Sequence, residues 1–345
     1  MLTLDGIIFS LQRYGGISVY FHELVRSLAA LNIKTDLLID GISLQNIEAP
    51  QPAISVHSRN SRILERYRDC SVLDSTSIFH SSYYRRPNRV ETPMVLTVYD
   101  FVYERYIKGI RSRMHTYQKN NAIKRANAVI CISESTRQDM LHYIGEIPGQ
   151  LVQVIHCGVS NEFIPTEKDA NVNPYILFVG QRSGYKNFEL ILRAMTYLPE
   201  LKLYCVGGGP LLDGELSVVS QNVRQRVLHI GYVDNKALNV LYNNALCLVY
   251  PSKYEGFGIP VIEAMRAGCP VVSSACSAVM EVGGGALIVV DGDDPKVMAQ
   301  GVERALGSDR SHLIEKGFSI AANYSWEMTH KKTIDVYQNL RVQHG

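Results

Sequence analysis

The chain of 345 residues has no long apolar run, no C-x-x-C pair and no large excess of charge of one sign. No stretch reaches the roughly 18 apolar residues that indicate a membrane-spanning helix. The first residues show no basic segment followed by an apolar run, so we expect neither a spanning helix nor a signal peptide. Both expectations favour a cytoplasmic protein.

Cysteine is present without a pairing pattern. The seven cysteines are an odd number, and most of them lie inside apolar runs such as VICIS and LYCVG. This distribution favours buried free thiols in a reducing compartment over a disulfide framework or a zinc site.

The charges nearly balance, with 35 Lys and Arg against 33 Asp and Glu, but their distribution is uneven. Residues 51–125 hold 14 of the basic and 6 of the acidic residues, an excess of eight positive charges. Two interpretations stay open: solvated helix faces and loops, or a surface for anionic lipid headgroups or an acceptor phosphate. Nucleic acid is less favoured, because no nucleic-acid motif accompanies the aromatic residues of this segment.

Short apolar runs alternate with amphipathic stretches along the whole chain, which is typical of parallel sheets covered by helices. The predicted strands of the first half are 3–9, 34–40, 53–58, 77–82, 94–100, 127–133 and 152–158. Those of the second half are 174–180, 201–209, 227–233, 246–252, 269–274 and 286–294.

A polar, proline-containing stretch at 159–174 separates the two series of strands. We therefore predict an α/β protein of two doubly wound domains, 1–165 and 170–325, followed by an amphipathic helix at 326–345. Ligands of such sheets bind beyond the carboxyl ends of the strands, so we expect a cleft that faces both sheets.

The densest motif is the segment YPSKYEGFGIPVIEAMRAGCPVVSS, in which seven residues separate Glu255 from Glu263. A strand leads into a loop with Gly256 and Gly258, and Pro260 suits the first turn of a helix. Free backbone N–H groups at such a helix start attract anionic or hydroxyl-rich ligands, and the two carboxylates can accept hydrogen bonds from sugar hydroxyls. Either glutamate alone also fits a helix cap or a surface position.

A second motif, GQRSGYKN, follows the first strand of the second half. Gly180 ends the strand, and Arg182 and Lys186 are two cations at a strand-to-helix turn, a pattern that suits a diphosphate or an ordinary surface pair. Asn187 can cap the next helix. In the first half, Gly15 and Gly16 open a predicted helix and let backbone amides approach a ligand.

Several polar residues follow strands of the first half. Asp100 ends a strand and is a candidate sugar or acceptor contact, while His80 is either a satisfied core histidine or a ligand contact. Arg85 and Arg86 belong to the basic segment and are candidate acceptor contacts. The Asp-x-Asp at 291–293 fits a turn before a helix better than a metal site.

The order of the motifs, a Gly-Gly loop, G-x-R-x-x-x-K-N, V-G-x-G-P and E-G-F-G-x-P-x-x-E-A-M, resembles the retaining nucleotide-sugar glycosyltransferases of the two-Rossmann (GT-B) architecture, family 4. The resemblance is strongest over about 175–275 and collinear but weaker over 1–160. In that architecture the C-terminal helix crosses back to the N-terminal domain.

The resemblance implies roles for these residues. Arg182 and Lys186 would hold the donor diphosphate, Glu263 would accept from the ribose, and Glu255 would contact the transferred sugar. Backbone groups of the donor site would come from Gly15, Gly16, Gly180, Phe257, Gly258 and Ile259. Asp100 would complete the catalytic set, with Tyr99 standing where related enzymes often carry a histidine.

The resemblance also implies a substrate class and no metal cofactor. The segments HSSYYRRP, TVYDF and EGFGIP are most similar to mannosyltransferases of bacterial surface polysaccharides, so GDP-mannose is the first expected donor and UDP-sugars the next. The acceptor would be a glycan or a lipid-linked saccharide, with peripheral contact to an anionic membrane. Two alternatives are a non-catalytic nucleotide-sugar-binding protein and a sugar-nucleotide epimerase.

Overall fold

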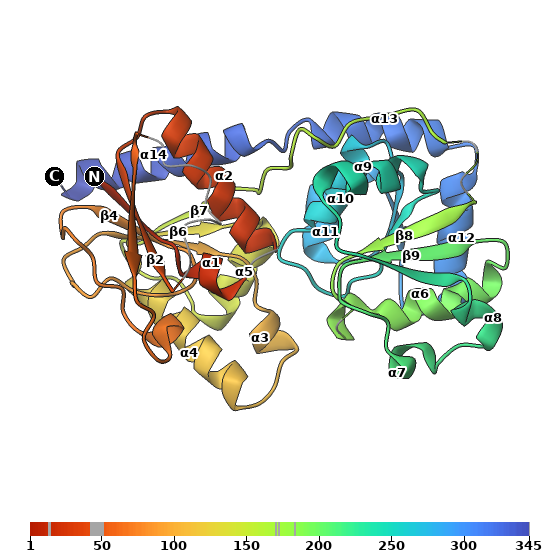
Figure 1. Ribbon diagram of the computed structural model, residues 1–345, viewed down its shortest axis with the longest axis horizontal. Coiled ribbons are helices and arrows are strands. Elements are labelled where there is room, and N and C mark those ends of the chain that lie inside the picture. The colour runs from red at the N-terminus through yellow and green to blue at the C-terminus, as the bar shows by residue number, and fades with distance from the viewer. Residues whose placement is uncertain (13–14, 42–51, 170, 172, 183, 345) are drawn as a thin grey trace. The chain divides into compact units, whose positions relative to one another are not determined.

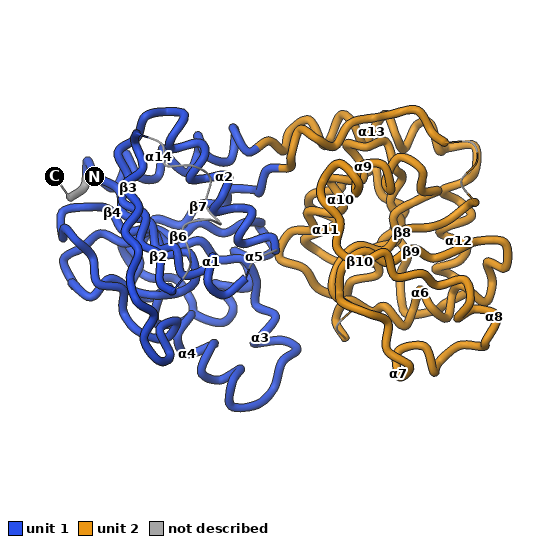
Figure 2. Tube along the Cα trace, viewed as in Figure 1, with its two compact units in different colours: residues 1–158, 326–345 blue, residues 159–325 orange. Residues whose placement is uncertain are grey.

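The computed structural model describes residues 1–12, 15–41, 52–169, 171, 173–182 and 184–344. The chain divides into two compact units (Figure 2): unit 1 contains residues 1–158 and 326–345, and unit 2 contains residues 159–325. Each unit has its own parallel sheet flanked by helices (Figure 1). The prediction of an α/β protein with two doubly wound sheets is confirmed.

The sheet of unit 1 has the strand order β3-β2-β1-β4-β5-β6-β7, and all its neighbours are parallel. Its strands are β1 (Leu2–Asp5), β2 (Thr35–Asp40), β3 (Ile54–Arg59), β4 (Ile78–Ser81), β5 (Met94–Val98), β6 (Ala128–Cys131) and β7 (Leu151–Val154). β1, β2, β4, β5 and β6 are buried along their whole length, and the sequences of β5 and β6 are almost continuously apolar, as expected for strands covered on both faces. The order reverses between β1 and β4.

The helices of unit 1 follow from local sequence signals. They are α1 (Ile7–Leu11), α2 (Gly16–Ala30), η2 (Glu65–Tyr67), α3 (Val102–Arg105), α4 (Ile110–Arg125), α5 (Glu134–Tyr143) and α14 (Trp326–His344). α2 buries Tyr20, Phe21, Leu24 and Leu28 at helical spacing, and α14 packs against α2 through the ring of Trp326, 5.9 Å from that of Tyr20.

The first predicted strand, 3–9, is wrong at its end, because β1 stops at Asp5 and α1 begins at Ile7. Two side chains accept the amides that open this helix. Asp5 Oδ1 accepts from Ile7 N at 3.2 Å, and Ser82 Oγ accepts from Ile8 N at 3.2 Å. The apolar run 3–9 therefore does not continue as a strand after Asp5. Its next residues form a helix, because polar side chains accept the first amides.

The sheet of unit 2 has the order β10-β9-β8-β11-β12-β13, again all parallel. Its strands are β8 (Tyr175–Val179), β9 (Lys202–Val206), β10 (Val227–Gly231), β11 (Leu248–Tyr250), β12 (Val271–Ser274) and β13 (Leu287–Val290). The core beneath it gathers apolar side chains of the sheet, α6 and α12, among them Ile176, Phe178, Ile191, Leu203, Val249, Val272 and Val302. The order reverses between β8 and β11.

The helices of unit 2 are η3 (Gly184–Lys186), α6 (Phe188–Ala194), η4 (Met195–Tyr197), α7 (Asp213–Leu216), α8 (Gln221–Arg224), α9 (Asn235–Asn244), α10 (Ile259–Arg266), α11 (Ser277–Gly283), η5 (Gly284–Ala286), α12 (Pro295–Leu306) and α13 (Arg310–Ala321). Asp294 caps α12 by accepting from Lys296 N, which confirms the predicted turn before this helix. The stretch expected to connect the two halves runs along α9, where asparagine side chains accept the amides of Ile164, Thr166 and Asp169.

Two features of the composition have a structural counterpart. All seven cysteines are buried and free, as predicted. In the part of the chain that the structure describes, no helix combines the length and hydrophobicity needed to cross a bilayer.

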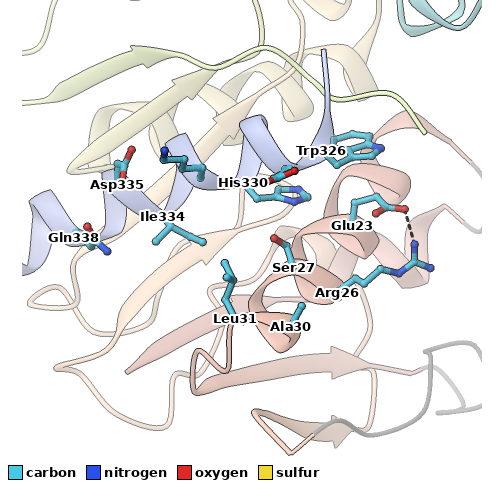
Figure 3. Close-up of a pocket in the computed structure, with 12 residues that line it drawn as sticks. Glu23, Arg26, Ser27, Ala30, Leu31, Trp326, His330, Ile334, Asp335 and Gln338 are labelled. Atoms are coloured by element: carbon cyan, nitrogen blue, oxygen red, sulfur yellow. Dashed lines mark hydrogen bonds and ion pairs between the residues drawn. The ribbon is translucent and has the colours of Figure 1, made fainter. Parts of the chain in front are cut away.

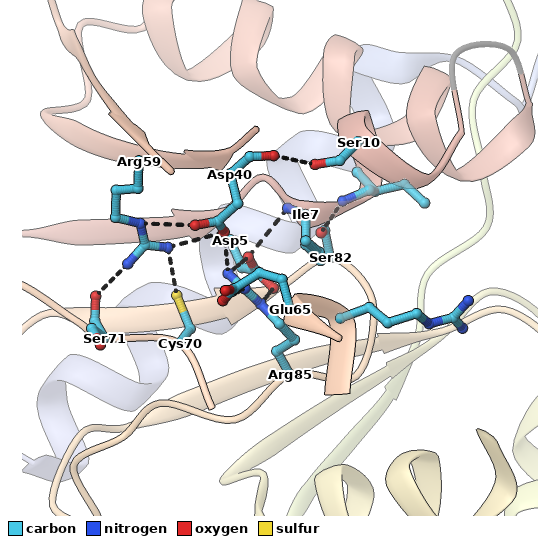
Figure 4. A network of polar contacts seen from close by, with 12 residues as sticks. Asp5, Ile7, Ser10, Asp40, Arg59, Glu65, Cys70, Ser71, Ser82 and Arg85 are labelled. Atoms are coloured by element: carbon cyan, nitrogen blue, oxygen red, sulfur yellow. Dashed lines mark hydrogen bonds and ion pairs between the residues drawn. The ribbon is translucent and has the colours of Figure 1, made fainter. Parts of the chain in front are cut away.

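A buried ion network holds the strand ends of unit 1 (Figure 4). The guanidinium of Arg85, which is 0% exposed, contacts Asp5 at 2.6 Å, Asp40 at 2.8 Å and Glu65 at 2.8 Å. Asp5 ends β1, Asp40 ends β2, and Glu65 lies in η2. The expectation that Arg85 contacts an acceptor is therefore corrected: its donors are taken up by three carboxylates inside the unit.

Two further arginines balance these carboxylates. Arg59 pairs with Asp40 at 3.1 Å, and Arg62 pairs with Glu65 at 2.7 Å. Hydrogen bonds from Arg62 lower the pKa of Glu65 to about 2, whereas desolvation raises the pKa of Asp5 against the attraction of Arg85. Mutual compensation of charges thus holds the network, whose centre, Arg85 with its three carboxylates, is buried from water.

Replacing Arg85 by alanine should destabilise unit 1 strongly, because three buried carboxylates lose their shared cation. We expect Arg85→Ala to cost about 3–5 kcal/mol. The neighbouring Arg86→Ala is the control, since Arg86 and Asp69 form a pair with side chains 44% and 42% exposed, and it should cost about 1 kcal/mol or less. Urea unfolding of both variants measures the difference; equal midpoints would contradict the structural role of Arg85.

Candidate active site

The order of the unit 2 sheet reverses between β8 and β11, and ligands of open α/β sheets bind beyond the carboxyl ends of strands at such a point. The chain leaves β8 at Gly180, whose φ of +129° favours glycine. It leaves β11 at Tyr250 and continues through residues 251–258 into α10. These two connections contain the two motifs that the sequence singled out.

An ion pair joins the two connections. Lys186 Nζ, at the end of η3, lies 2.6 Å from Glu255 Oε1, in the loop before α10. Lys186 Nζ also lies 3.4 Å from the hydroxyl of Tyr250. The side chains of Lys186 and Glu255 are only 14% and 10% exposed, so water screens the pair little. Desolvation also raises the pKa of Tyr250, which stays a neutral phenol.

The start of α10 lies directly after this pair. α10 begins at Ile259, as predicted, and Gly258 precedes it with a φ of +108° and no capping side chain. A Cβ at Gly258 would lie 3.3 Å from Val279 Cγ2, so both conformation and space favour glycine there. A helix start without a side-chain cap, next to a lysine, is suited to an anionic ligand.

Glu263 lies one turn inside α10 and contacts a residue of α9. The hydroxyl of Tyr242 donates to Glu263 Oε2 at 2.9 Å. Desolvation raises the pKa of Glu263 to about 7, although the hydrogen bond from Tyr242 opposes the shift. The carboxyl therefore changes its charge near neutral pH and can either donate to or accept from a ligand.

Arg182 is engaged within unit 2 and does not extend a free fork. Its guanidinium donates to the backbone carbonyls of Gly207, Gly208, Gly209 and Pro210 at 2.8–3.2 Å. Its Nε donates to Glu215 Oε1 at 2.9 Å, and its side chain is 4% exposed. Arg182 thus holds the V-G-G-G-P loop that follows β9.

The neighbouring Asn187 does not cap α6 as expected. It occupies the N-cap position with a φ of +54°, but its side chain makes no cap and instead donates to Asp293 Oδ1 at 2.9 Å. Asp293 also pairs with Lys253. Within the described residues, no group of three or more His, Cys, Asp or Glu side chains is arranged to hold a metal ion.

Comparison with known proteins identifies the family of the chain. The family model described as "Glycosyl transferases group 1" matches residues 160–319, and that described as "Glycosyltransferase Family 4" matches residues 14–163. The chain belongs to glycosyltransferase family 4. The fold, with one parallel sheet of seven strands and one of six, is the GT-B fold.

Individual proteins and solved structures are also similar to this family 4 glycosyltransferase. O-antigen chain mannosyltransferase B of Escherichia coli is 28% identical over 286 residues, which cover 76% of this chain and 74% of the relative. Among solved structures, sucrose-phosphate synthase from Thermosynechococcus elongatus is similar with a TM-score of 0.78 and 18% identity, over 99% of both chains. HepE of Anabaena, solved with UDP-glucose, is similar with a TM-score of 0.73 and 14% identity, over 98% of this chain and 99% of that one.

In unit 1 of this glycosyltransferase, Gly15 and Gly16 form the start of α2, as predicted. Gly15 is the N-cap, and a Cβ there would come within 2.5 Å of the Gln12 side chain. Asp100 follows β5: its Oδ1 accepts from Val102 N at 3.0 Å, and its carbonyl accepts from the buried Lys119 at 2.9 Å.

His80 is a core residue of this glycosyltransferase. Its ring is buried between Tyr337 Oη at 2.6 Å and Thr97 Oγ1 at 2.9 Å, so both ring nitrogens have partners. Burial lowers the pKa of His80 to about 3, which keeps it neutral. The expectation of an acceptor contact is corrected in favour of the structural alternative.

The sequence did not indicate several other features of this glycosyltransferase. Tyr242 and Glu215 contact predicted site residues, but they come from separate elements and carry no motif of their own. Tyr250, in contrast, stands at the strand end inside the densest motif and could have been found there. A groove of about 600 Å³ between α2 and α14, lined by residues such as Arg26, Leu31 and Trp326, is visible only in the structure (Figure 3).

The contact between Arg182 and the glycine loop predicts different effects for two adjacent glycines. A Cβ at Gly208 would meet Arg182 Nη1 at 2.8 Å, whereas one at Gly209 meets nothing within 4 Å, and both residues have φ near +70° (+73° and +72°). We expect Gly208→Ala to lower the free energy of unfolding by about 1–3 kcal/mol more than Gly209→Ala. Urea unfolding compares them; identical losses would mean that Arg182 does not hold this loop.

The raised pKa of Glu263 predicts a pH-dependent stability. An ionised, desolvated carboxyl costs folding free energy that is absent below its ordinary pKa of 4.5 and grows as the pH rises to about 7. Glu263→Gln keeps an acceptor for Tyr242 but cannot ionise. It should therefore match the wild type near pH 4 and exceed its stability by about 1–3 kcal/mol near pH 8. The exposed Glu200→Gln controls for charge loss; a constant difference for Glu263→Gln would contradict the shift.

Proposed function

We propose that this family 4 enzyme transfers a hexose, with retention of configuration, from a nucleotide sugar to a glycan or lipid-linked saccharide of a surface polysaccharide. The first proposed donor is GDP-mannose, and a UDP-sugar is the next. The observation that carries the proposal is the Lys186–Glu255 pair at the strand reversal of unit 2, beside the start of α10. The similarity to an O-antigen chain mannosyltransferase supports mannose, and the similarity to a structure solved with UDP-glucose supports the alternative.

The proposed donor site lies at the carboxyl edge of the unit 2 sheet. The ammonium of Lys186 binds the diphosphate and neutralises charge as it leaves, assisted by the start of α10. Glu255 contacts the transferred sugar together with backbone amides of Phe257, Gly258 and Ile259. Glu263 binds the ribose hydroxyls, since its carboxyl can accept or donate near neutral pH.

Arg182 and Gly180 complete the proposed donor site. Glu215 and the loop carbonyls take up most of the donors of Arg182, so on this proposal the donor phosphate replaces one of these acceptors. Gly180, with no side chain, leaves room for the donor beside the β8 end. In unit 1, we propose that Gly15 and Gly16 contact the donor and that Asp100 and Arg86 contact the sugar or acceptor.

The proposed reaction breaks the bond between the anomeric carbon and the diphosphate oxygen and forms a bond from the same face to an acceptor hydroxyl. The hydroxyl proton passes to the departing diphosphate. Lys186 and the α10 start stabilise the negative charge that develops on that leaving group. On this proposal the chain's own groups provide the electrostatic stabilisation and no metal is required.

The experiment measures donor binding and turnover together. Thermal shifts of the purified chain with GDP-mannose, UDP-glucose and the free nucleotides identify the donor, since a ligand of the folded state raises the melting temperature. Radiolabelled donor with a saccharide acceptor then identifies the product and its anomeric configuration, with and without EDTA. Stabilisation by no nucleotide sugar, conversion of the donor without an acceptor, or loss of transfer in EDTA would contradict the corresponding part of the proposal.

Lys186→Ala should lower the rate of transfer by about 10²–10³-fold, because it removes a cation placed at the leaving group. Lys253→Ala is the matched control: Lys253 lies in the loop before α10, but it pairs with Asp293 and is 42% exposed. Its rate should stay within about threefold of the wild type. Steady-state kinetics with the identified donor compares the two; equal rates would remove Lys186 from the site.

A further inference from the structure

The groove of about 600 Å³ between α2 and α14 has no part in the proposed transfer reaction (Figure 3). We call it the α2–α14 groove and define it by its lining residues on 23–31 and 326–338. Both helices belong to unit 1, so this unit forms the groove by itself. At 1.5 Å per residue, the α14 side is about 18 Å long, which is enough for a chain of several small rings.

The lining combines apolar and polar side chains. Figure 3 shows Ile334 of α14 pointing toward Leu31 of α2, while Trp326 and Gln338 lie at opposite ends of the groove. The hydroxyl of Ser27 is added from the α2 side. A concave site with apolar contact area and a few placed polar groups is typical of ligand-binding pockets.

One buried polar atom of the groove has no partner among the residues that the structure describes. The ring of His330 extends from α14 toward α2 (Figure 3), and this residue is 1% exposed, yet its Nε2 makes no hydrogen bond. The ring stacks on Trp326, with the centroids 5.6 Å apart and the planes inclined by 13°. An unpaired buried nitrogen costs folding free energy, which a hydrogen-bonding ligand in the groove would recover.

The charges of the groove nearly cancel. Glu327, Lys331 and Asp335 alternate in sign at intervals of four residues along α14, and Glu23 pairs with Arg26 at 3.2 Å on α2. Burial also lowers the pKa of His330 to about 4, so its ring is neutral near pH 7. Mixed signs attract neither a polyanion nor a polycation strongly. Carboxylate acceptors beside ammonium and guanidinium donors instead suit a neutral ligand with many hydroxyl groups.

We propose that the α2–α14 groove binds a neutral saccharide chain. The C–H face of a sugar ring packs on aromatic and aliphatic side chains such as Trp326 and Ile334, and its hydroxyls donate and accept as the groove requires. A partner helix with an apolar face would leave the charged groups and His330 Nε2 without partners, so the saccharide is the better complement.

The groove lies apart from the residues proposed for transfer. Its α2 side starts at Glu23, seven residues after Gly16, which corresponds to roughly 10 Å along the helix. A bound saccharide chain is therefore held near the proposed donor contact of unit 1 without occupying it. The proposal rests on the proposed function only for the choice of mannose as the sugar.

The test uses a probe that the chain itself supplies. Trp326 is the only tryptophan of the sequence, so intrinsic tryptophan fluorescence reports on this groove alone. The full chain is titrated with linear α-linked mannotetraose, with maltotetraose, and with inorganic phosphate as the anionic probe. We expect a saturable change of emission with mannotetraose between about 0.1 and 10 mM and none with phosphate. No saturable change with either saccharide, or one with phosphate, would overturn the proposal.

The titration contains no donor, so it fails or succeeds independently of the proposed transfer reaction. His330→Phe keeps a ring against Trp326 but removes the ring nitrogens. It should weaken mannotetraose binding about five- to tenfold in isothermal titration calorimetry, without lowering the melting temperature. The control is His312→Phe on an exposed position of α13. A lower melting temperature with unchanged affinity would make His330 a structural residue only and would contradict the proposal.

A second variant closes the groove without touching the core. Ala30→Phe places a ring in the groove and should weaken mannotetraose binding about tenfold or more, because the ring and the saccharide compete for the same space. Ala237→Phe, on an exposed position of α9, is the matched control and should bind as the wild type does. Circular dichroism should show all four variants folded.

The remaining outcomes identify other occupants. If Ala30→Phe and His330→Phe both bind mannotetraose as tightly as the wild type, the groove is not the site. If light scattering shows a dimer that Ala30→Phe dissociates, and no saccharide binds, the occupant is a second copy of the chain and the proposal is wrong. Transfer to a single-sugar acceptor should be unchanged in both variants, since neither residue belongs to the proposed donor or acceptor site.

Discussion

The ion pair between Lys186 and Glu255 connects the two strand ends at which the unit 2 sheet reverses its order. A pair this poorly exposed adds little net stability, because desolvating both charges offsets most of their attraction. Removing either partner alone is costly, however, so each holds the other in place. The pair thereby keeps a cation beside the start of α10, where an anionic ligand gains from both. On the proposed function, the donor diphosphate would compete with Glu255 for Lys186 and so free the carboxylate for hydroxyl groups of the donor.

Unit 1 uses its cations differently, and this difference explains the uneven charge of residues 51–125. Arg85 is buried among three carboxylates, and Arg59 and Arg62 complete that network. Lys119 is buried against Glu104 and the carbonyl of Asp100. The basic excess of this segment is therefore partly structural. What is left uncompensated is concentrated around α4, next to apolar side chains that the unit does not bury.

The strands could be predicted because both faces of a parallel sheet are covered, which leaves runs such as 94–98, apolar except for Thr97, and 128–131, wholly apolar. The positions at which helices and strands begin and end depend on side chains that are distant in the sequence. The run that begins at Leu2 becomes helical at Ile7 because Ser82, distant in sequence, accepts an amide of α1. Similarly, the predicted helix after Asn187 ends as an α-helix at Ala194 and continues as the 3₁₀ turn η4. A local sequence pattern does not show which distant side chains will be hydrogen-bond partners at such an end.

The same reasoning separates the site residues that could be predicted from those that could not. Lys186 and Glu255 follow adjacent strand ends, so topology alone brings them together. Arg85 and Arg182 are cations like Lys186, but their partners could not be predicted. Those of Arg85 are carboxylates 20 to 80 residues away in the sequence, and those of Arg182 include backbone carbonyls, which any residue supplies. An arginine has five donors. In Arg182, Nε donates to Glu215, Nη1 donates to the carbonyl of Gly207, and Nη2 faces the carbonyls of Gly208, Gly209 and Pro210. A basic residue beside a glycine loop is therefore a ligand contact only where its donors remain accessible, and only a structure reports that.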